Sequence, residues 1–165
     1  LLVSSAASDV YKRQVSSDRD FVQLQRFPNV KQYSPILKKE VVESNPRLFL
    51  QTHIIKGDKG DGVPNILSED NVFVEGFRQT PMSKKKIDNI IEDLDDGELL
   101  YAASWYRNYC RNKKLIDLTE TPNDLKRQII NSFEEQDPWP NKGNVFPYLV
   151  SKNCNELIKS VQEFV

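Results

Sequence analysis

Residues 44–66 read SNPRLFLQTHIIKGDKGDGVPNI, and this stretch holds the clearest helix-to-loop boundary in the sequence. Ser44 and Pro46 predict the start of a helix, because proline is tolerated in the first helical turn. Gly57 predicts the end of that helix, since glycine readily adopts the backbone conformations that follow a last helical turn. The apolar residues on the predicted helix are Leu48, Phe49, Ile54 and Ile55.

The loop Gly57–Gly62 combines acidic residues with three of the chain's six glycines. Asp58 and Asp61 stand three residues apart, and the glycines let backbone groups come close to a phosphate or a monovalent ion. The alternative is a helix that ends at a glycine and is followed by an ordinary acidic loop. A calcium-binding EF-hand is a poor fit, because its loop needs more oxygen ligands and a glutamate at its twelfth position.

A second acidic motif lies near the start of the chain. Val15–Ser17 predicts the end of a strand, Asp18 a helix N-cap, and Pro28 the limit of the helix that follows. Open α/β sheets place ligands beyond the carboxyl ends of their strands, so Asp18 and Asp20 are expected to point into one crevice. Their hard oxygens suit Mg²⁺ or Mn²⁺. The alternative is a helix cap beside a solvated acid.

The remaining elements predict a fold that is mixed at first and helical afterwards. A hairpin is expected from Val30–Ser34 and Glu40–Glu43. Helices are expected to open at Thr80-Pro81 and Thr121-Pro122. Further helical residues are Leu99, Ala103, Tyr106 and Cys110, then Leu125, Ile129 and Phe133, and finally Leu157, Ile158 and Val161. Residues 137–143, DPWPNKG, predict a connection between helices.

These elements give an α/β fragment, the end of a parallel sheet with a short hairpin, followed by a mainly α-helical domain. The predicted division is 15–43 for the α/β remnant and 44–165 for the helical domain. Residues 1–14, LLVSSAASDVYKRQ, do not fit this pattern and are interpreted as an artefactual or disordered leader; a genuine surface strand is the alternative. A first half of the nuclease domain is expected to be missing, because the strand at Val15 has no preceding element to pair with.

Composition excludes several classes of protein. The chain has 165 residues, with 23 basic and 24 acidic residues and a net charge of −1. It has no run of about 18 apolar residues, so a transmembrane helix is not expected. Cys110 and Cys154 are too few for a disulfide framework or a zinc cluster, which indicates a reduced, intracellular protein. The near-zero charge neither requires nor excludes nucleic acid.

Together the two acidic motifs resemble those of a known family. The sequences VSSDRDFVQL (15–24) and KGDKGDGVPN (56–65) are similar to those of the 5′ nuclease family of flap endonucleases and 5′→3′ exonucleases, in its phage ribonuclease H branch. NVKQYSP (29–35) and RQTPMSKKK (78–86) extend the resemblance, which covers Val15–Val165. Gly62 stands where many relatives have asparagine, and the family's other carboxylates and its helical arch lie in a preceding half that this sequence lacks.

The resemblance implies roles for particular residues. Asp18 and Asp20, with Asp58 and Asp61, would be the catalytic carboxylates that hold two Mg²⁺ or Mn²⁺ ions, which activate water and stabilise the leaving oxygen. The loop would belong to a helix-two-turn-helix element that grips duplex DNA, with a K⁺ ion bound at the loop. The DNA-binding residues implied are Lys56, Gly57, Lys59, Gly60, Gly62, Val63, Lys84 and Lys85. For the lysines at 84–86 the alternative is a solvated helix face.

The predicted function is therefore the C-terminal part of a divalent-metal-dependent 5′→3′ exonuclease and flap endonuclease of ribonuclease H type. The whole enzyme would remove RNA primers and 5′ flaps during phage DNA replication in the cytoplasm of an infected bacterium, with no membrane association. Its implied partners are duplex or flap DNA, RNA–DNA hybrid, the phage single-stranded-DNA-binding protein and the sliding clamp. This chain alone is expected to be truncated and inactive.

Two rivals to this function stay open. One is a non-catalytic duplex-DNA-binding module, which would have no need of four aspartates that repel phosphate. The other is a helical phage protein whose motifs arise by chance.

Three other features are expected to be structural. His53, the only histidine, is expected on a helix surface. The acidic run Glu92–Glu98 is expected to be solvated. The aromatic residues Trp105, Tyr106 and Tyr109 can stack on bases, but core packing is favoured.

Overall fold

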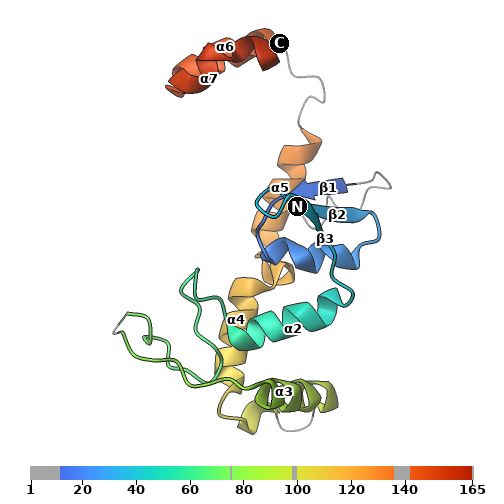
Figure 1. The fold of residues 1–165 in the computed structure, drawn as a ribbon, viewed down its shortest axis with the longest axis vertical. Coiled ribbons are helices and arrows are strands. Elements are labelled where there is room, and N and C mark those ends of the chain that lie inside the picture. The colour runs from blue at the N-terminus through green and yellow to red at the C-terminus, as the bar shows by residue number, and fades with distance from the viewer. Residues whose placement is uncertain (1–11, 75, 98–99, 136–141, 165) are drawn as a thin grey trace. The chain divides into compact units, whose positions relative to one another are not determined.

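The computed structural model describes residues 12–74, 76–97, 100–135 and 142–164 (Figure 1). These residues are mostly helical, with one small sheet, and they belong to two compact units, Leu1–Ile130 and Asn131–Val165. Among the residues described, no helix is both long and apolar enough to cross a membrane. The division expected after residue 43 lies inside the first unit, because the helix after it packs against the segment before it.

The sheet has three strands in the order β1-β2-β3. Strand β1 (Lys12–Val15) pairs in parallel with β2 (Val30–Ser34), and β2 pairs antiparallel with β3 (Lys39–Val41). The first strand was expected at Val15–Ser17 and the third at Glu40–Glu43, so both predictions were displaced along the chain. Lys12–Gln14 had been assigned to the leader, but their backbones pair with β2. The rest of the leader, residues 1–11, lies outside the described residues.

The segment between β1 and β2 is the 3₁₀ helix η1 (Asp20–Arg26) rather than an α-helix capped by Asp18. Asp18 instead accepts a hydrogen bond from the Asp20 backbone N–H at 2.9 Å, forming a turn before the helix begins. The helix ends before Pro28, as predicted. The buried Gln23 amide donates to the Ile116 carbonyl at 3.1 Å and accepts from the Leu118 N–H at 3.0 Å. This pair of bonds ties η1 to a helix about 90 residues later in the sequence.

Helix α2 (Pro46–Lys56) begins and ends where the sequence predicted. The Asn45 side chain caps it by accepting a hydrogen bond from the Leu48 N–H at 3.0 Å. Its Ile55 packs with Ile66 and with residues of α3, while Ile54 packs with Val63 and Ile116. Helix α2 is therefore the central element of the first unit, with core contacts on two sides.

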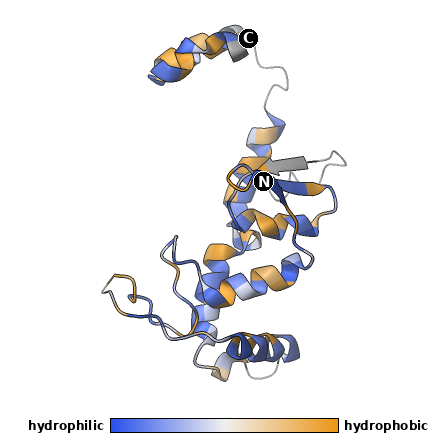
Figure 2. Cartoon of the chain, viewed as in Figure 1, coloured by the Kyte–Doolittle hydropathy of each residue, from blue (hydrophilic) through white to orange (hydrophobic). Residues whose placement is uncertain are grey.

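Helix α3 (Lys84–Asp96) is capped by the Ser83 side chain and starts later than the predicted Thr80-Pro81. The reason is that Thr80 is held by an earlier segment: its N–H donates to Ser68 Oγ at 2.9 Å, and its carbonyl accepts from the Asn65 amide, also at 2.9 Å. The core residues Ile87 and Ile90 face α2. Most of the α3 surface in view is hydrophilic (Figure 2).

Helix α4 (Tyr106–Ile116) belongs to this unit, and α5 (Asn123–Glu134) begins in it but extends past its last residue, Ile130. The 3₁₀ turn η2 (Leu100–Ala102) precedes α4, and η3 (Leu118–Glu120) precedes α5. On α5 the three predicted apolar side chains remain largely exposed, at 45, 44 and 57% for Leu125, Ile129 and Phe133. Trp105 and Tyr109 pack against the α2–α3 core, which favours their structural interpretation. The predicted helical residue Leu99 lies outside the described residues.

The fully buried Asn112 on α4 connects three segments. Its amide donates to the Ile54 carbonyl of α2 and to the Pro64 carbonyl of the following loop, both at 2.8 Å. Burying an amide without partners would be costly, so these bonds fix where α4 lies against α2. The same bonds hold the loop close to the end of α2.

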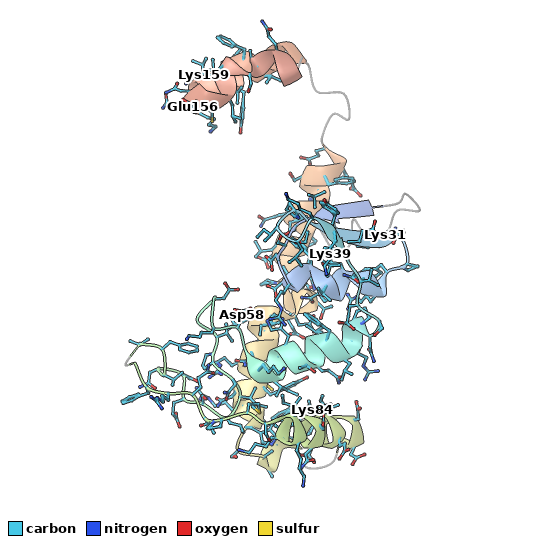
Figure 3. The ribbon with its side chains drawn as sticks, viewed as in Figure 1. Lys31, Lys39, Asp58, Lys84, Glu156 and Lys159 are labelled. Carbon is cyan, nitrogen blue, oxygen red and sulfur yellow. The ribbon has the colours of Figure 1, made fainter. Side chains whose placement is uncertain are left out.

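The second unit contains η4 (Lys142–Asn144), α6 (Val145–Ser151), α7 (Asn155–Lys159) and η5 (Val161–Phe164). The predicted terminal helical residues Leu157 and Ile158 lie on α7. Lys159 and Glu156 form an exposed ion pair at 2.7 Å (Figure 3). Most of the predicted connection 137–143 lies outside the described residues.

Candidate functional site

The chain reverses direction directly after α2, and Gly57 makes this possible. Its φ of 68° and ψ of −178° are accessible essentially only to glycine. A Cβ atom at Gly57 would lie 2.3 Å from the Val63 carbonyl oxygen. The returning strand is held by a bond from the Val63 N–H to the Asp58 carbonyl at 2.7 Å, and by another from the Ile66 N–H to the Ile55 carbonyl at 3.1 Å. Asp58 is thereby fixed at the end of α2 (Figure 3).

The Asp58 carboxylate is held from both sides. One oxygen accepts the Gly60 N–H at 2.8 Å, and the other lies 3.1 Å from His53 Nε2. Partial burial by itself would raise the pKa of Asp58, but the hydrogen bonds from His53, Gly60 and Asp61 outweigh it and lower that pKa. Asp58 is thus firmly ionised at neutral pH.

The turn that carries Asp18 and Asp20 is supported from beneath by the sheet. The buried Gln32 of β2 donates to the Ser16 carbonyl at 3.0 Å and to the Asp18 carbonyl at 2.7 Å. Ser17 and Ser34 share a hydrogen bond of 2.7 Å. These contacts hold the backbone of the turn. The Asp18 side chain is exposed, and the Asp20 side chain is partly exposed.

His53 joins the two acidic segments. Its Nδ1 lies 3.7 Å from Asp20 Oδ1, and its Nε2 faces Asp58. The side chain is only 6% exposed, so the expectation of a helix-surface histidine was wrong. The burial arises because α2 packs against η1, a long-range contact that helical periodicity does not reveal. The available signal was the position of the single histidine five residues before Asp58.

The three other predicted carboxylates all act electrostatically on Asp20. Burial raises the pKa of Asp20, and the negative charges of Asp18, Asp61 and Asp58 raise it further, against the opposing effect of His53. Carboxylates that repel each other are stabilised by a nearby cation. The structure therefore concentrates negative charge where the D-x-D and G-D-x-x-D motifs meet.

These residues offer the kind of ligand that a divalent cation prefers, but too few of them lie close together to hold one. Four carboxylates offer the hard oxygens that Mg²⁺ and Mn²⁺ prefer. Within the described ranges, however, no three histidine, cysteine or acidic side chains lie close enough together to hold a metal ion. The described residues of this chain therefore do not by themselves form a complete metal site.

The loop's backbone amides are largely engaged inside the protein. The N–H groups of Gly57, Gly60, Gly62 and Val63 donate to His53, Asp58, Lys59 and Asp58 respectively. The Val63 side chain is buried against Ile54. Gly60 and Gly62 are exposed, as are Lys56 and Lys59. Contacts from this loop to a phosphate would thus come chiefly from lysine side chains.

The two other predicted DNA-binding lysines lie on a different helix. Lys84 and Lys85 are exposed in the first turn of α3. In the view of Figure 3, Lys84 lies on the other side of α2 from Asp58. These lysines do not belong to the cluster around His53.

An ion-pair cluster that the sequence analysis missed lies on the segment after the loop. Asp70 pairs with Arg107 at 2.6 Å and also with Arg111. Hydrogen bonds from these arginines lower the pKa of Asp70. Arg111 also donates to the Pro64 carbonyl at 3.2 Å, so this cluster has a structural role in holding the segment after the loop against α4.

Two glycine variants test the geometry of the loop. We expect Gly57→Ala to lower the free energy of unfolding by at least about 3 kcal/mol, because it combines backbone strain with a collision against Val63. Gly62 also has a positive φ, of 74°, but a Cβ atom there meets nothing within 4 Å. Gly62→Ala should therefore cost only about 1 kcal/mol. Urea unfolding measures the loss in free energy of unfolding for each variant. Equal losses for the two variants would contradict this geometry.

Burial and charge repulsion at Asp20 predict that removing its charge stabilises the fold in a pH-dependent way. A raised carboxyl pKa means that ionised Asp20 destabilises the fold at neutral pH, and that this cost vanishes as pH falls through the raised pKa. We expect Asp20→Asn to stabilise the protein by about 0.5–1 kcal/mol at pH 7, with a gain that shrinks toward pH 4. Thermal unfolding of this variant and of the control Asp88→Asn, an exposed α3 residue, measures the effect. A lower midpoint for Asp20→Asn at pH 7 would refute it.

Comparison with known proteins identifies the family of the chain. Residues 44–164 match the family model described as T4 RNase H, C terminal. Across 155 residues the chain is 32% identical to Ribonuclease H of Enterobacteria phage T4. The aligned region covers 91% of this chain and 50% of that protein. The chain thus spans about half the length of the curated relative that it matches. On this evidence the chain belongs to the phage T4 ribonuclease H family, and it corresponds to the C-terminal portion of that protein.

Proposed function

We propose that the chain is the C-terminal part of a 5′→3′ exonuclease and flap endonuclease that removes RNA primers and 5′ flaps during phage DNA replication. The observation that carries this proposal is that Asp20 and Asp58 both lie beside the His53 ring. Asp20 Oδ1 is 3.7 Å from Nδ1, and Asp58 Oδ2 is 3.1 Å from Nε2. This contact brings together the two motifs on which the resemblance depends. The similarity to a protein named Ribonuclease H, which extends over 91% of the chain, supports the same conclusion.

The four aspartates are proposed to contribute oxygen ligands to Mg²⁺ or Mn²⁺. Burial and the charges of Asp18, Asp61 and Asp58 raise the pKa of Asp20, which supports this role because a nearby cation would stabilise its ionised form. Since the described residues hold no set of three ligands, the aspartates supply only part of a metal site. Two fully liganded ions would need further oxygen donors.

The segment from α2 through the loop to α3 is proposed as the helix-two-turn-helix element that binds duplex DNA, with K⁺ at the loop. Lys56 and Lys59 are exposed on it, whereas the loop amides donate within the protein. Lysine side chains bind phosphates without reading base edges, so the expected binding is independent of sequence. RNA–DNA hybrid is a proposed substrate, and the single-stranded-DNA-binding protein and sliding clamp are proposed partners.

A non-catalytic duplex-binding module is the second candidate. The observation that favours it is the lack of any three-ligand cluster among the described residues. It predicts DNA binding that does not respond to a divalent cation or to loss of an aspartate.

Replacing Lys59 tests the DNA-binding part of the proposal. We expect Lys59→Ala to weaken duplex binding about 3–10-fold, equally for unrelated sequences, and to reduce the salt dependence by about one phosphate contact. Lys114→Ala removes an exposed lysine of α4 and is the matched control. Fluorescence anisotropy at several salt concentrations measures both. A change in sequence preference would argue against phosphate contact, and equal losses for the two variants would argue against this loop.

A metal titration separates the two candidate functions. If the aspartates bind metal, Mn²⁺ should bind the 165-residue chain weakly, at about millimolar concentration, and Asp61→Asn should weaken this binding. Asp61 is exposed, so the substitution should leave the fold intact, and Asp88→Asn is the control. Electron paramagnetic resonance of free Mn²⁺ measures the binding, and cleavage of a 5′-flap substrate is followed with Mg²⁺.

The proposal predicts slow cleavage at best, because the ligand set is incomplete. Fast cleavage that Asp18→Asn abolishes would show that the set is complete in this chain. Mn²⁺ binding that Asp61→Asn leaves unchanged would favour the non-catalytic module.

A further inference from the structure

A pocket of about 490 Å³ opens beside the acidic cluster, within the first compact unit. Its wall is formed by Arg19 from the D-x-D turn, by residues of α2 including Phe49 and His53, and by Asp58 and Lys59 of the loop. The volume lies in the range of about 300–1,000 Å³ that small-molecule sites occupy. The pocket therefore adjoins both acidic motifs and is large enough for a nucleotide.

The pocket is lined by more cationic than anionic side chains. Arg19, Lys56 and Lys59 line it, together with the carboxylates of Glu43 and Asp58. Both carboxylates are already engaged: Asp58 with His53 and Gly60, and Glu43 through a 3.0 Å bond from the Asn45 N–H. In the part of the chain that the structure describes, none of the three cations forms an ion pair with a carboxylate. Three positive side chains thus face the pocket without an anionic partner.

An aromatic side chain stands beside these cations. The guanidinium of Arg19 lies 5.6 Å from the centre of the Phe49 ring, and the His53 ring meets Phe49 edge-on at 5.9 Å. Arg19 is exposed, lines the pocket and makes no capping hydrogen bond with its side chain. Cations next to an aromatic wall match a ligand with a phosphate at one end and a ring system at the other.

We propose that this pocket binds the 5′-phosphate monoester of a nucleotide, with Arg19 as its principal phosphate ligand. A monoester carries nearly two negative charges at neutral pH, more than the single charge of an internal phosphodiester, and so suits a pocket lined by three cations better. Guanidinium groups also bind phosphate through two parallel hydrogen bonds. The choice of a nucleic-acid ligand rests on the proposed function; the ligand is either the 5′ end of a strand or a released mononucleotide.

The test compares nick-containing duplexes that differ only in a 5′-phosphate or a 5′-hydroxyl group at the nick. We expect the wild-type chain to bind the phosphorylated duplex about 5–10-fold more tightly, as one charge-assisted contact provides. Arg19→Gln should abolish this preference. Arg26→Gln is the matched control, because Arg26 lies at the other end of η1, 4.8 Å from the Phe27 ring, and does not line the pocket.

Competition by 5′-AMP and by adenosine distinguishes the two sources of the phosphate. Displacement of the phosphorylated duplex by 5′-AMP but not by adenosine would assign the site to a free mononucleotide. A 5′-phosphate preference that 5′-AMP does not affect would assign it to a strand end. Equal binding of the two duplexes by the wild type, or a preference retained in Arg19→Gln, would overturn the inference. In that case duplex binding through Lys59 would still stand, so failure of this inference would be distinguishable from failure of the proposed function.

Discussion

The buried His53 ring, between Asp20 on one edge and Asp58 on the other, is the contact on which the site depends. A side chain with two polar nitrogens is costly to bury unless both have partners, and the two carboxylates face them. These acids come from segments 38 residues apart, and α2 carries the ring that lies between them. Gly57 completes the arrangement, because only glycine lets the chain turn so tightly that Asp58 returns to His53 one turn later.

Two aspartates of the cluster affect stability at neutral pH in opposite directions. Burial raises the pKa of Asp20, and repulsion from three other aspartates raises it further. Asp58 has the opposite shift, because hydrogen bonds from His53 and Gly60 hold its charge in place. Groups with opposite shifts side by side are typical of functional sites rather than of surfaces that serve only solubility. Because the loop amides donate within the protein, the groups available to bind an anion are the side chains of Lys56, Lys59 and Arg19, which line the pocket.

Local signals in the sequence predicted α2 well and the neighbouring elements less well. Pro46 and Gly57 act through their own backbone preferences, so both ends of α2 were correct. Thr80-Pro81 looked like a helix start, but Thr80 is bonded to Ser68, and α3 begins after Ser83 instead. Both motifs could be recognised from residue types and spacing. The burial of His53 could not, since it depends on α2 packing against η1, and nothing local to residues 44–66 encodes that contact.

The most direct test of the account uses the fact that the chain has one histidine. With ¹⁵N-labelled histidine, a long-range ¹H–¹⁵N spectrum reports both ring nitrogens of His53 without ambiguity. The account predicts that Asp20→Asn shifts chiefly the Nδ1 signal and Asp58→Asn chiefly the Nε2 signal, while Asp88→Asn on α3 leaves both unchanged. Ring nitrogens that respond to Asp58→Asn but not to Asp20→Asn would show that the two acidic segments do not meet, and would contradict the central claim.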